Sequence, residues 1–331
     1  MLAGGIACSK HVIDSFGGFK KPANFPEANY HFNTNEITQA KFELGRKLFY
    51  EPRLSRDNTV SCGGCHIQSA GFTHHGHDVS HGIDDRLGKR NSPPIMNLAW
   101  GKTFFWDGGV FDLDLQPIVP ITNPVEMDET MENVLSKLRN HPDYPGLFNK
   151  AFGSSDINTE RVMKALSQFM VMLVSANSKY DSVMRNQGAT FTADEKQGYE
   201  LFKTHCGSCH KEPLFTDESF RDNGIGAGPN NDEGRYLVTL NESDKYKFKV
   251  PSLRNISYTA PYMHDGRFIT IEAVLEHYVG HVKNTPNLDP LLKQGTVPGI
   301  SSTSAEQSKI IMFLRTLNDK DFISDKRFSE Q

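Results

Sequence analysis

The sequence predicts a mainly α-helical protein made of two similar halves, and three observations support this prediction. Apolar residues recur at helical spacings over several long stretches, as amphipathic helices require. We find no convincing alternation of apolar and polar residues of the kind that half-buried strands show. The pattern Gly-x-x-Leu-Phe followed by Cys-x-x-Cys-His occurs twice, at residues 45–66 and 198–210, which predicts an internal repeat.

The two Cys-x-x-Cys-His motifs lie 144 residues apart. They are typical of c-type haem attachment, in which two thiols form thioethers to the haem vinyl groups and the following histidine binds the iron. A zinc site fits less well, because such sites gather their Cys and His ligands within a few tens of residues. A thioredoxin-like redox pair would need a βαβ pattern, and none surrounds either motif. The sequence therefore predicts two covalent haems, held by Cys62, Cys65, His66, Cys206, Cys209 and His210.

Length and composition describe an ordinary globular chain. Its 331 residues are 37% hydrophobic and 23% charged, enough for two domains or one large one. A net charge of −4 argues against a nucleic-acid partner, because phosphate binding needs a concentrated basic patch. No apolar run approaches the ~20 residues that span a bilayer. We expect the most apolar stretch, 162–174, to be a core helix whose methionines pack rather than bind iron.

The first ten residues contain small residues before a lone cysteine, Cys8. They are too short for a signal peptide but resemble the end of a bacterial lipoprotein leader, with Cys8 as the lipid-anchored residue. The alternative is a disordered end with a spare thiol. Because bacteria attach haem c outside the cytoplasm, we expect a periplasmic or otherwise extracytoplasmic protein in either case.

The first half should begin with a surface extension, because residues 9–34 are rich in Pro, Gly, Asn and Phe. Thr34 or Asn35 can then cap a helix that runs to about residue 50, with the first motif in the loop and short turn that follow. Residues 142–146 are rich in Gly and Pro and should interrupt the helical pattern. Further helices are expected near 128–140 and 158–185.

The second half should begin with a helix capped by Thr192, since two acidic residues follow in its favourable first turn. A polar, glycine-rich loop follows at 223–234, and helices are expected near 270–278 and 304–317. We therefore predict three parts, each haem domain being mainly α and cytochrome c-like. They are an N-terminal extension at 1–35, a first haem domain at 36–186 and a second haem domain at 187–331.

The segment between the two motifs indicates more than electron carriage. A haem that only carries electrons has both axial positions filled, whereas a catalytic haem needs an open side and a group that moves protons. The candidate groups are Trp106 in a Trp-Asp-Gly run, Gln116, and Glu126 in Asn-Pro-Val-Glu-Met.

Together these motifs resemble the bacterial di-haem cytochrome c peroxidase family, which also includes the MauG type that oxidises tryptophan in a precursor protein. The resemblance covers nearly the whole chain from about residue 36. The two haem motifs, Trp-Asp-Gly, Asn-Pro-x-Glu-Met and a late Pro-Tyr-x-His-Asp-Gly follow the family's order. Gln116 and Glu126 follow Trp106 by 10 and 20 residues, spacings that the family shares.

The resemblance implies a role for each of these three residues. Glu126 would be the acid/base beside the first haem, because its carboxylate can take a proton from hydrogen peroxide and return it as the O–O bond breaks. Gln116 would form hydrogen bonds in the same pocket, and Trp106 would relay electrons between the haems. From the residues alone, Glu126 could instead be a carboxylate at a helix start and Trp106 a core aromatic residue.

The resemblance also implies a removable sixth ligand of the first haem, and His81 in the run His-Gly fits it best. Reduction of the second haem would release this histidine and open the iron to peroxide. The same loop offers three competitors, and the cluster could equally be a solvated loop. The competitors are His74, His75 and His77.

Calcium is a further cofactor that the resemblance implies. Asn91 would bind it together with backbone oxygens of Thr259 and Pro261, and hard oxygen donors suit calcium. The alternative is ordinary turn chemistry, in which Pro-rich loops use Asn and Thr routinely.

The chain departs from the family's peroxidases at the second haem. They usually place a Met on its distal side, 14 residues after the histidine of His-Asp-Gly, where this chain has Tyr278 and the MauG type carries Tyr. A phenolate ligand favours ferric iron and lowers the potential relative to Met. Met263 and His277 are nearby alternatives, and Tyr278 could instead be a packed helix aromatic.

The resemblance therefore implies a di-haem peroxidase that reduces hydrogen peroxide to water with electrons from a small cytochrome c or copper protein. A MauG-like oxidase of a protein or organic substrate is the alternative within the same fold. His81 favours the peroxidase and Tyr278 favours the alternative. Glu126 and Gln116 argue against a third option, a non-catalytic electron-transfer cytochrome. Family members are often homodimers, which makes a second copy a candidate partner.

Overall fold

The computed structural model describes residues 16–331, so the leader-like segment with Cys8 lies outside the described residues. The chain is mainly helical, as expected. Its elements are, in order, α1 Gln39–Phe49, η1 Pro52–Leu54, α2 Cys62–Cys65, η2 Gln68–Ala70, η3 Ile83–Asp85, η4 Leu98–Trp100, α3 Ile118–Thr122, α4 Met131–Arg139, α5 Tyr144–Phe152, α6 Thr159–Val171, α7 Lys179–Met184, α8 Ala193–His205, β1 Phe220–Arg221, α9 Tyr236–Thr239, η5 Glu242–Asp244, β2 Phe248–Lys249, α10 Ile271–Glu276, η6 His277–His281, η7 Pro290–Leu292, α11 Ser304–Arg315 and α12 Lys320–Ser324.

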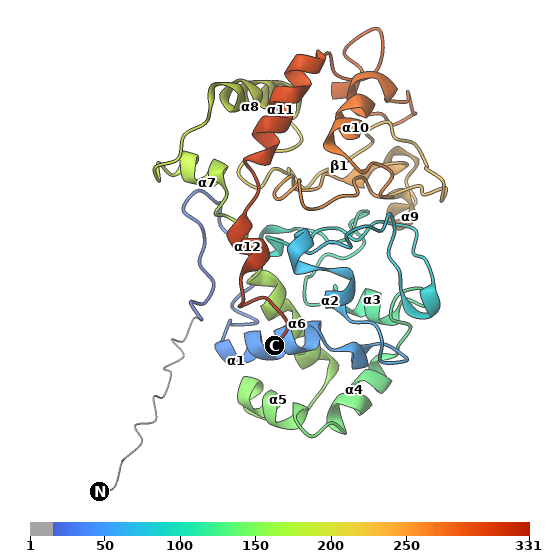
Figure 1. Cartoon of the computed structure of the whole chain (residues 1–331). Helices are drawn as coiled ribbons and strands as arrows, with labels where there is room; N and C mark the ends of the chain where they lie inside the picture. The colour runs from blue at the N-terminus through green and yellow to red at the C-terminus, as the bar shows by residue number, and fades with distance from the viewer. Residues whose placement is uncertain (1–15) are drawn as a thin grey trace, which may run out of the picture.

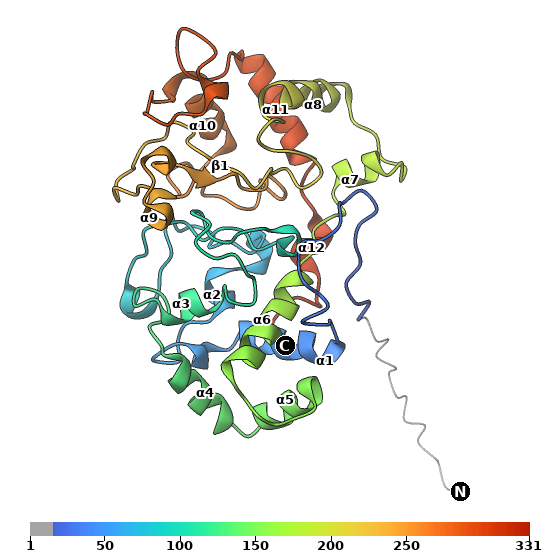
Figure 2. The same ribbon diagram turned by 180° about the vertical axis from the view of Figure 1, so that it is seen from behind.

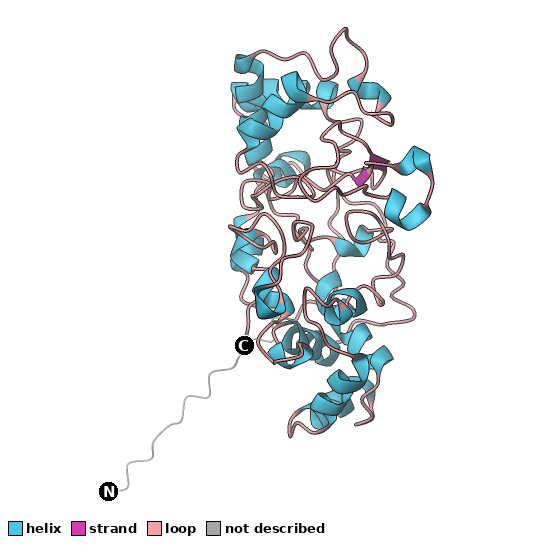
Figure 3. Ribbon diagram, turned by 90° about the vertical axis from the view of Figure 1, so that its right-hand side faces the viewer, coloured by secondary structure: helices cyan, strands magenta, loops and turns pink. Residues whose placement is uncertain are grey.

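The described chain forms two lobes stacked end to end (Figure 1). In this view the lower lobe holds α1 to α6 and the upper lobe holds α8 to α11. Helices and loops make up nearly all of it, and the antiparallel pair β1–β2 is only two residues long on each side (Figure 3). Within residues 16–331, no helix is both long and apolar enough to cross a membrane.

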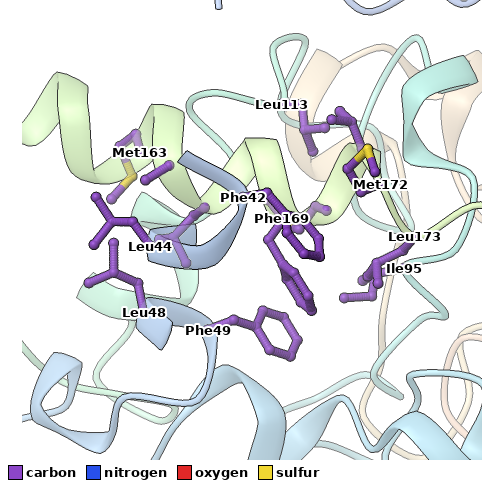
Figure 4. Close-up of a cluster of buried hydrophobic side chains, with 14 of the residues drawn as sticks. Phe42, Leu44, Leu48, Phe49, Ile95, Leu113, Met163, Phe169, Met172 and Leu173 are labelled. Atoms are coloured by element: carbon purple, nitrogen blue, oxygen red, sulfur yellow. The ribbon is translucent and has the colours of Figure 1, made fainter. Parts of the chain in front are cut away.

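The core of the lower lobe is built on α1 and α6, which pack against each other (Figure 4). The rings of Phe49 and Phe169 lie 4.9 Å apart between centroids. A Cβ on Gly45 would lie 1.9 Å from the carbonyl oxygen of Ala165, so only glycine allows the two helices to come this close. The side chains of Met163, Met170 and Met172 are buried in this core, which confirms the expected core helix.

The core of the upper lobe is built in the same way on α8 and α11. The rings of Phe202 and Phe313 lie 5.0 Å apart. A Cβ on Gly198 would lie 1.9 Å from the carbonyl oxygen of Lys309. The glycine of each Gly-x-x-Leu-Phe run therefore lies against the backbone of a partner helix, one in each lobe.

The helix starts agree only in part with the sequence. Thr192 caps α8 as expected, and it forms a capping box with Glu195. The cap of α1 is Thr38 and not Thr34 or Asn35. The earlier candidates are used elsewhere, because the hydroxyl of Thr34 bonds to a turn carbonyl and the amide of Asn35 donates to the backbone of α6.

Three other boundaries differ from the sequence pattern. The predicted interruption at 142–146 is confirmed only in part, because α4 ends at Arg139 and α5 already starts at Tyr144, with Pro145 in its first turn, where a missing N–H is tolerated. The stretch 158–185 is two helices, since α6 ends at Val171 and Ser178 caps α7. The helix expected near 270–278 is α-helical only to Glu276, because α10 is followed directly by the π-helical turn η6.

The N-terminal segment is not a simple surface extension. Phe25 is buried and its ring lies 4.9 Å from that of Trp100 in an edge-on contact, with Phe19 at 5.6 Å on the same indole. Aromatic side chains therefore tie residues 16–34 to the lower lobe.

The C-terminal segment crosses from the upper lobe back to the lower one (Figures 1 and 2). Phe322 of α12 and Phe328 are buried in the core of the lower lobe. The ring of Phe322 lies 5.5 Å from that of Phe72, and the side chain of Gln68 donates a hydrogen bond to the carbonyl of Asp325. The core of the lower lobe therefore contains side chains from both α1 and the C-terminal segment.

Candidate functional site

The first Cys-x-x-Cys-His motif lies on the wall of a cavity of about 710 Å³ in the lower lobe. Cys62 and Cys65 form the single helical turn α2, and Ser61 caps it by accepting a hydrogen bond from the Gly64 N–H at 3.2 Å. One turn of helix brings the two sulfurs and the following imidazole to one side, as attachment of a flat ring requires. The lining residues include Cys62, Cys65, His66, Trp106, Gln116 and Glu126.

His66 is held in the tautomer that an iron ligand needs. Its Nδ1–H donates to the carbonyl oxygen of Phe72 at 2.9 Å, which leaves Nε2 as the acceptor nitrogen. Burial lowers the pKa of His66, so the ring is neutral and its Nε2 lone pair is free for a metal. The same backbone bond fixes the plane of the ring.

The chemistry of the cysteines fits thioether formation. Burial raises the pKa of Cys62 to about 12 and that of Cys65 to about 11. Both cysteines line the first cavity beside His66, as thioether attachment of a haem requires. Within the part of the chain that the structure describes, no three His, Cys, Asp or Glu side chains are arranged to hold a metal ion between them.

Glu126 lies in the wall of the same cavity as His66. Burial raises its pKa, and a hydrogen bond from Asn123 opposes that shift only in part. Its segment is fixed from behind, because the backbone N–H of Ile83 donates to the carbonyl of Glu126 at 2.7 Å. A carboxyl group with a raised pKa can exchange protons closer to neutral pH than an exposed one. Gln116 shares this wall, so the structure brings the two predicted polar groups together with the first motif.

The second motif lies on the wall of a cavity of about 210 Å³ in the upper lobe. Cys206, Cys209 and His210 all line it. Burial raises the pKa of Cys206 to about 12 and lowers that of His210. The Nδ1–H of His210 donates to the carbonyl oxygens of Phe215 and Pro251, each at 3.1 Å, so its Nε2 is again the free nitrogen.

Two of the three candidate ligands opposite the second motif line this cavity. Tyr278, in η6, and Met263 are both on its wall. The amide of Asn223 reaches both of them, at 3.4 Å to the Tyr278 hydroxyl and 3.5 Å to the Met263 sulfur. His277 is not on the wall, and its Nε2 is hydrogen-bonded to the carbonyl of Asn223 at 3.1 Å. Burial raises the pKa of Tyr278 to about 12, so the phenol stays protonated unless a bound metal cation lowers its pKa.

Trp106 lies between the two sites, because its side chain belongs to the walls of both cavities. The indole N–H donates to the carbonyl of Asn91 at 2.8 Å, and the Trp106 carbonyl accepts from the N–H of Lys249 at 2.7 Å. One bond thus fixes the indole ring and the other fixes the backbone of Trp106, in a position between the predicted haem sites.

The ring of His81 does not line the first cavity, although its neighbours Ser80 and Gly82 do. It lies 4.3 Å from the ring of His77, which stacks at 4.1 Å on His74. The histidines of this loop therefore gather beside the first cavity and not inside it.

The three predicted calcium ligands lie on the wall of the second cavity. The amide of Asn91 donates from its nitrogen to the carbonyls of His77 and Asp78, each at 3.1 Å. Its Oδ1 is therefore left as a hard oxygen donor, which suits calcium. Thr259 and Pro261 line the same cavity as Asn91.

Sequence reasoning missed three residues that support the site. Gly82 allows the histidine loop to touch the Glu126 segment, Lys249 holds Trp106, and Asn223 bridges the candidate ligands of the second haem. Gly82 appeared in the sequence only as part of the His-Gly run, and Asn223 begins the polar, glycine-rich loop at 223–234, whereas Lys249 carried no signal.

Comparisons with known proteins agree with this geometry. A model of the di-haem cytochrome c peroxidase family matches residues 39–189. The chain is 37% identical over 308 residues to the methylamine utilization protein MauG of Methylorubrum extorquens, a match that covers 90% of this chain and 83% of that protein. It is 36% identical over 279 residues to the cytochrome c551 peroxidase of Nitrosomonas europaea, covering 83% of this chain and 79% of that protein.

The fold has a similar solved structure of matching length. A MauG-like protein associated with microbial copper homeostasis superposes with a TM-score of 0.86 at 30% identity, covering 94% of this chain and 98% of that one.

Proposed function

The chain belongs to the di-haem cytochrome c peroxidase family, and from this premise we propose that it reduces hydrogen peroxide to water with electrons from a small cytochrome c or copper protein. The single observation that supports this most is the partly buried Glu126 on the same cavity wall as His66. A carrier of electrons alone has no use for a proton-exchanging carboxyl group beside its iron site.

The reaction consumes two electrons and two protons for each peroxide and forms two waters. Haem, when bound at each motif, supplies the redox-active iron. Glu126 takes the proton of the peroxide oxygen nearer the iron and delivers it to the far oxygen, so that water and not hydroxide leaves. Gln116 orients the peroxide by hydrogen bonding from the same wall.

Electrons enter at the upper lobe and reach the lower one through Trp106. Its position on both cavity walls supports this role, and so does the hydrogen bond that fixes its ring. We assign the two lobes as two copies of one cytochrome c-like domain, with boundaries near residues 36, 186 and 331. The matched packing of Gly45 and Gly198 supports that assignment.

We propose His81 as the removable ligand of the first haem. A local turn of the backbone at Ser80 and Gly82 would swing its ring into the cavity that these neighbours line. We propose calcium at Asn91, Thr259 and Pro261, where it would tie the histidine loop to the upper lobe.

The protein acts outside the cytoplasm, because haem c is attached there. We further propose that Cys8 carries a lipid anchor and that the protein forms a homodimer. Neither proposal is needed for the chemistry of the site.

The test is peroxide turnover by the protein loaded with both haems, with a reduced small cytochrome c as the electron donor. Wild type should oxidise the donor in proportion to peroxide, and Glu126→Gln should lose about 100-fold or more of that rate. Absence of turnover by wild type would exclude the peroxidase. Equal rates in the two proteins would exclude the role of Glu126.

Tyr278 favours a second function, oxidation of a protein or organic substrate as in MauG. An anionic phenolate on the second iron stabilises its oxidised state, which suits an oxidase better than an electron store. The two functions differ in what reduces the protein. If peroxide is consumed only when an oxidisable protein or aromatic compound replaces the donor cytochrome, the MauG-like function is the right one.

A further inference from the structure

Two tyrosines of the upper lobe share one carboxylate. The hydroxyl of Tyr180 donates to Oε1 of Glu212 at 2.6 Å, and that of Tyr199 donates to the same oxygen at 2.8 Å. Short bonds from two phenols to one carboxylate are charge-assisted, and each lies within the range in which a proton can transfer. Nothing in the peroxide chemistry described above uses this arrangement.

The pair is connected to the second haem site by packed aromatic rings. Phe202 is on the wall of the second cavity, and its ring lies 5.6 Å from that of Phe215. Phe215 packs 4.8 Å from Tyr180, and its carbonyl accepts the hydrogen bond of the haem ligand His210. Tyr180 therefore packs against Phe215, and Phe215 in turn contacts His210, the proposed ligand of the second iron.

The other end of the pair reaches the surface. Tyr180 is buried, whereas Tyr199 is partly exposed, and their ring centroids lie 6.4 Å apart. The ammonium group of Lys203 lies 4.5 Å from the Tyr199 ring centroid. A cation there opposes any build-up of positive charge on the ring, so Tyr199 can lose an electron only if its proton leaves at the same time.

We propose that Tyr180, Tyr199 and Glu212 form a redox relay that carries one-electron oxidation from the second haem to the surface at Tyr199. In this step one electron leaves the phenol of Tyr199 for the oxidised haem, by way of Tyr180. The phenol O–H bond breaks, its proton goes to the carboxylate of Glu212, and a neutral tyrosyl radical remains. An external phenol then gives one electron to Tyr199, which recovers its proton from Glu212, while the proton of the external phenol passes to water. The substrate class at this end is therefore an oxidisable phenol.

The relay rests on the proposed function, because hydrogen peroxide is its oxidant. It adds a second route for oxidising equivalents, separate from Trp106. It also explains why two phenols are placed on one acceptor, since either can pass its proton to Glu212 while the electron moves between them.

The experiment uses the full chain with both haems and one equivalent of hydrogen peroxide. One sample is frozen within milliseconds for electron paramagnetic resonance, and a second reacts with a biotin-labelled phenol whose adducts are located by peptide mass spectrometry. Both signals are normalised to the haem oxidised, read from its absorption. Wild type should give a tyrosyl signal and an adduct at Tyr199.

The variants separate the relay from general oxidation. Tyr199→Phe and Glu212→Gln should each lower the normalised tyrosyl signal at least tenfold, and Glu212→Gln should do the same to the adduct at Tyr199. Tyr180→Phe should lower the adduct at Tyr199 while leaving that residue present. Tyr258→Phe is the matched control, because Tyr258 neighbours the lining residue Thr259 and its hydroxyl makes no hydrogen bond within residues 16–331; it should match wild type.

The outcomes are distinguishable. Haem oxidation by peroxide without a tyrosyl signal would overturn the relay and leave the peroxidase intact. An unchanged adduct in Glu212→Gln, with that variant folded and loaded with haem, would overturn it as well. If peroxide oxidises neither haem, the proposed function fails and the relay fails with it. Should Glu212→Gln not fold, Tyr180→Phe decides the question, because it keeps the ring and the packing.

Discussion

Gly82 lies directly against the backbone of Glu126. A Cβ at position 82 would be 2.5 Å from the Cα and the carbonyl oxygen of Glu126. The adjacent N–H of Ile83 donates to that same carbonyl at 2.7 Å. The loop that carries His81 and the segment that carries the proposed acid/base are therefore in contact, and neither can move without affecting the other.

Gly82→Ala should displace the Glu126 segment, because a methyl group cannot fit between the two backbones. We expect peroxide turnover to fall by about 10- to 100-fold, the usual result of a misplacement of about 1 Å. Steady-state kinetics would measure this, with haem content as the control for folding. Turnover equal to wild type would show that the contact does not position Glu126.

The pH dependence of turnover should follow Glu126. Burial raises its pKa, and the base form is the carboxylate, so activity should rise with pH through a value above the ~4.3 of an ordinary Glu. Glu126→Gln should lose this acid limb along with most of its rate.

The free energy of unfolding should fall as pH rises, which is the opposite of the trend expected for activity. A carboxyl whose pKa is higher in the folded than in the unfolded chain favours folding fully below its ordinary pKa. That contribution is lost as pH rises through the folded value. Denaturation midpoints measured across this window should show the loss in wild type and not in Glu126→Gln, and identical pH profiles for the two would contradict a raised pKa.

Tyr278→Met should replace a hard ligand on the second iron by a soft one. We expect the reduction potential of the second haem to rise, since a neutral thioether stabilises ferrous iron relative to a phenolate. Spectroelectrochemistry of the half-reduced protein measures this. Met263→Leu is the control, and a large change there with none in Tyr278→Met would identify Met263 as the ligand.

Calcium should stabilise the protein through Asn91. At a concentration 100-fold above its Kd, a bound ion adds about 2.7 kcal/mol to the free energy of unfolding, so a chelator should lower the thermal midpoint. Asn91→Ala should remove most of this response. Asn91→Asp should retain it, because an oxygen ligand remains while the bonds to His77 and Asp78 are lost. A response that survives in Asn91→Ala would locate calcium elsewhere.

The two helix-contact glycines should be equally intolerant of a side chain. Gly45→Ala and Gly198→Ala each drive a methyl group into a carbonyl oxygen, and we expect a loss of about 1–3 kcal/mol in the free energy of unfolding. Gly146→Ala in α5 is the matched control, since nothing lies within 4 Å of its Cβ. Replacing this helical glycine by alanine should raise the free energy of unfolding by up to about 1 kcal/mol. Chemical denaturation measures all three.

Local patterns predicted much of the fold and of the site. The haem motifs, the cap at Thr192 and the core helix at 162–174 depend on residues within one or two turns of each other, and the structure confirms the cap and the core helix. Trp106 and Glu126 were predicted from the family resemblance, whose motifs lie along a single segment, and both line the first cavity.

Contacts between distant segments could not be predicted in this way. The approach of Gly82 to Glu126 and the hold of Lys249 on Trp106 join residues 44 and 143 positions apart, which no local period encodes. The cap of α1 was misplaced for the same reason. Asn35 was the better cap by residue type, but its side chain binds α6 from across the core.

The last turn of the chain has a consequence for assembly. Phe322 and Phe328 fill a gap beside Phe72, immediately after the first haem motif. These two rings come from the last segment of the described chain, so the core of the lower lobe is complete only when residues 320–328 pack against it.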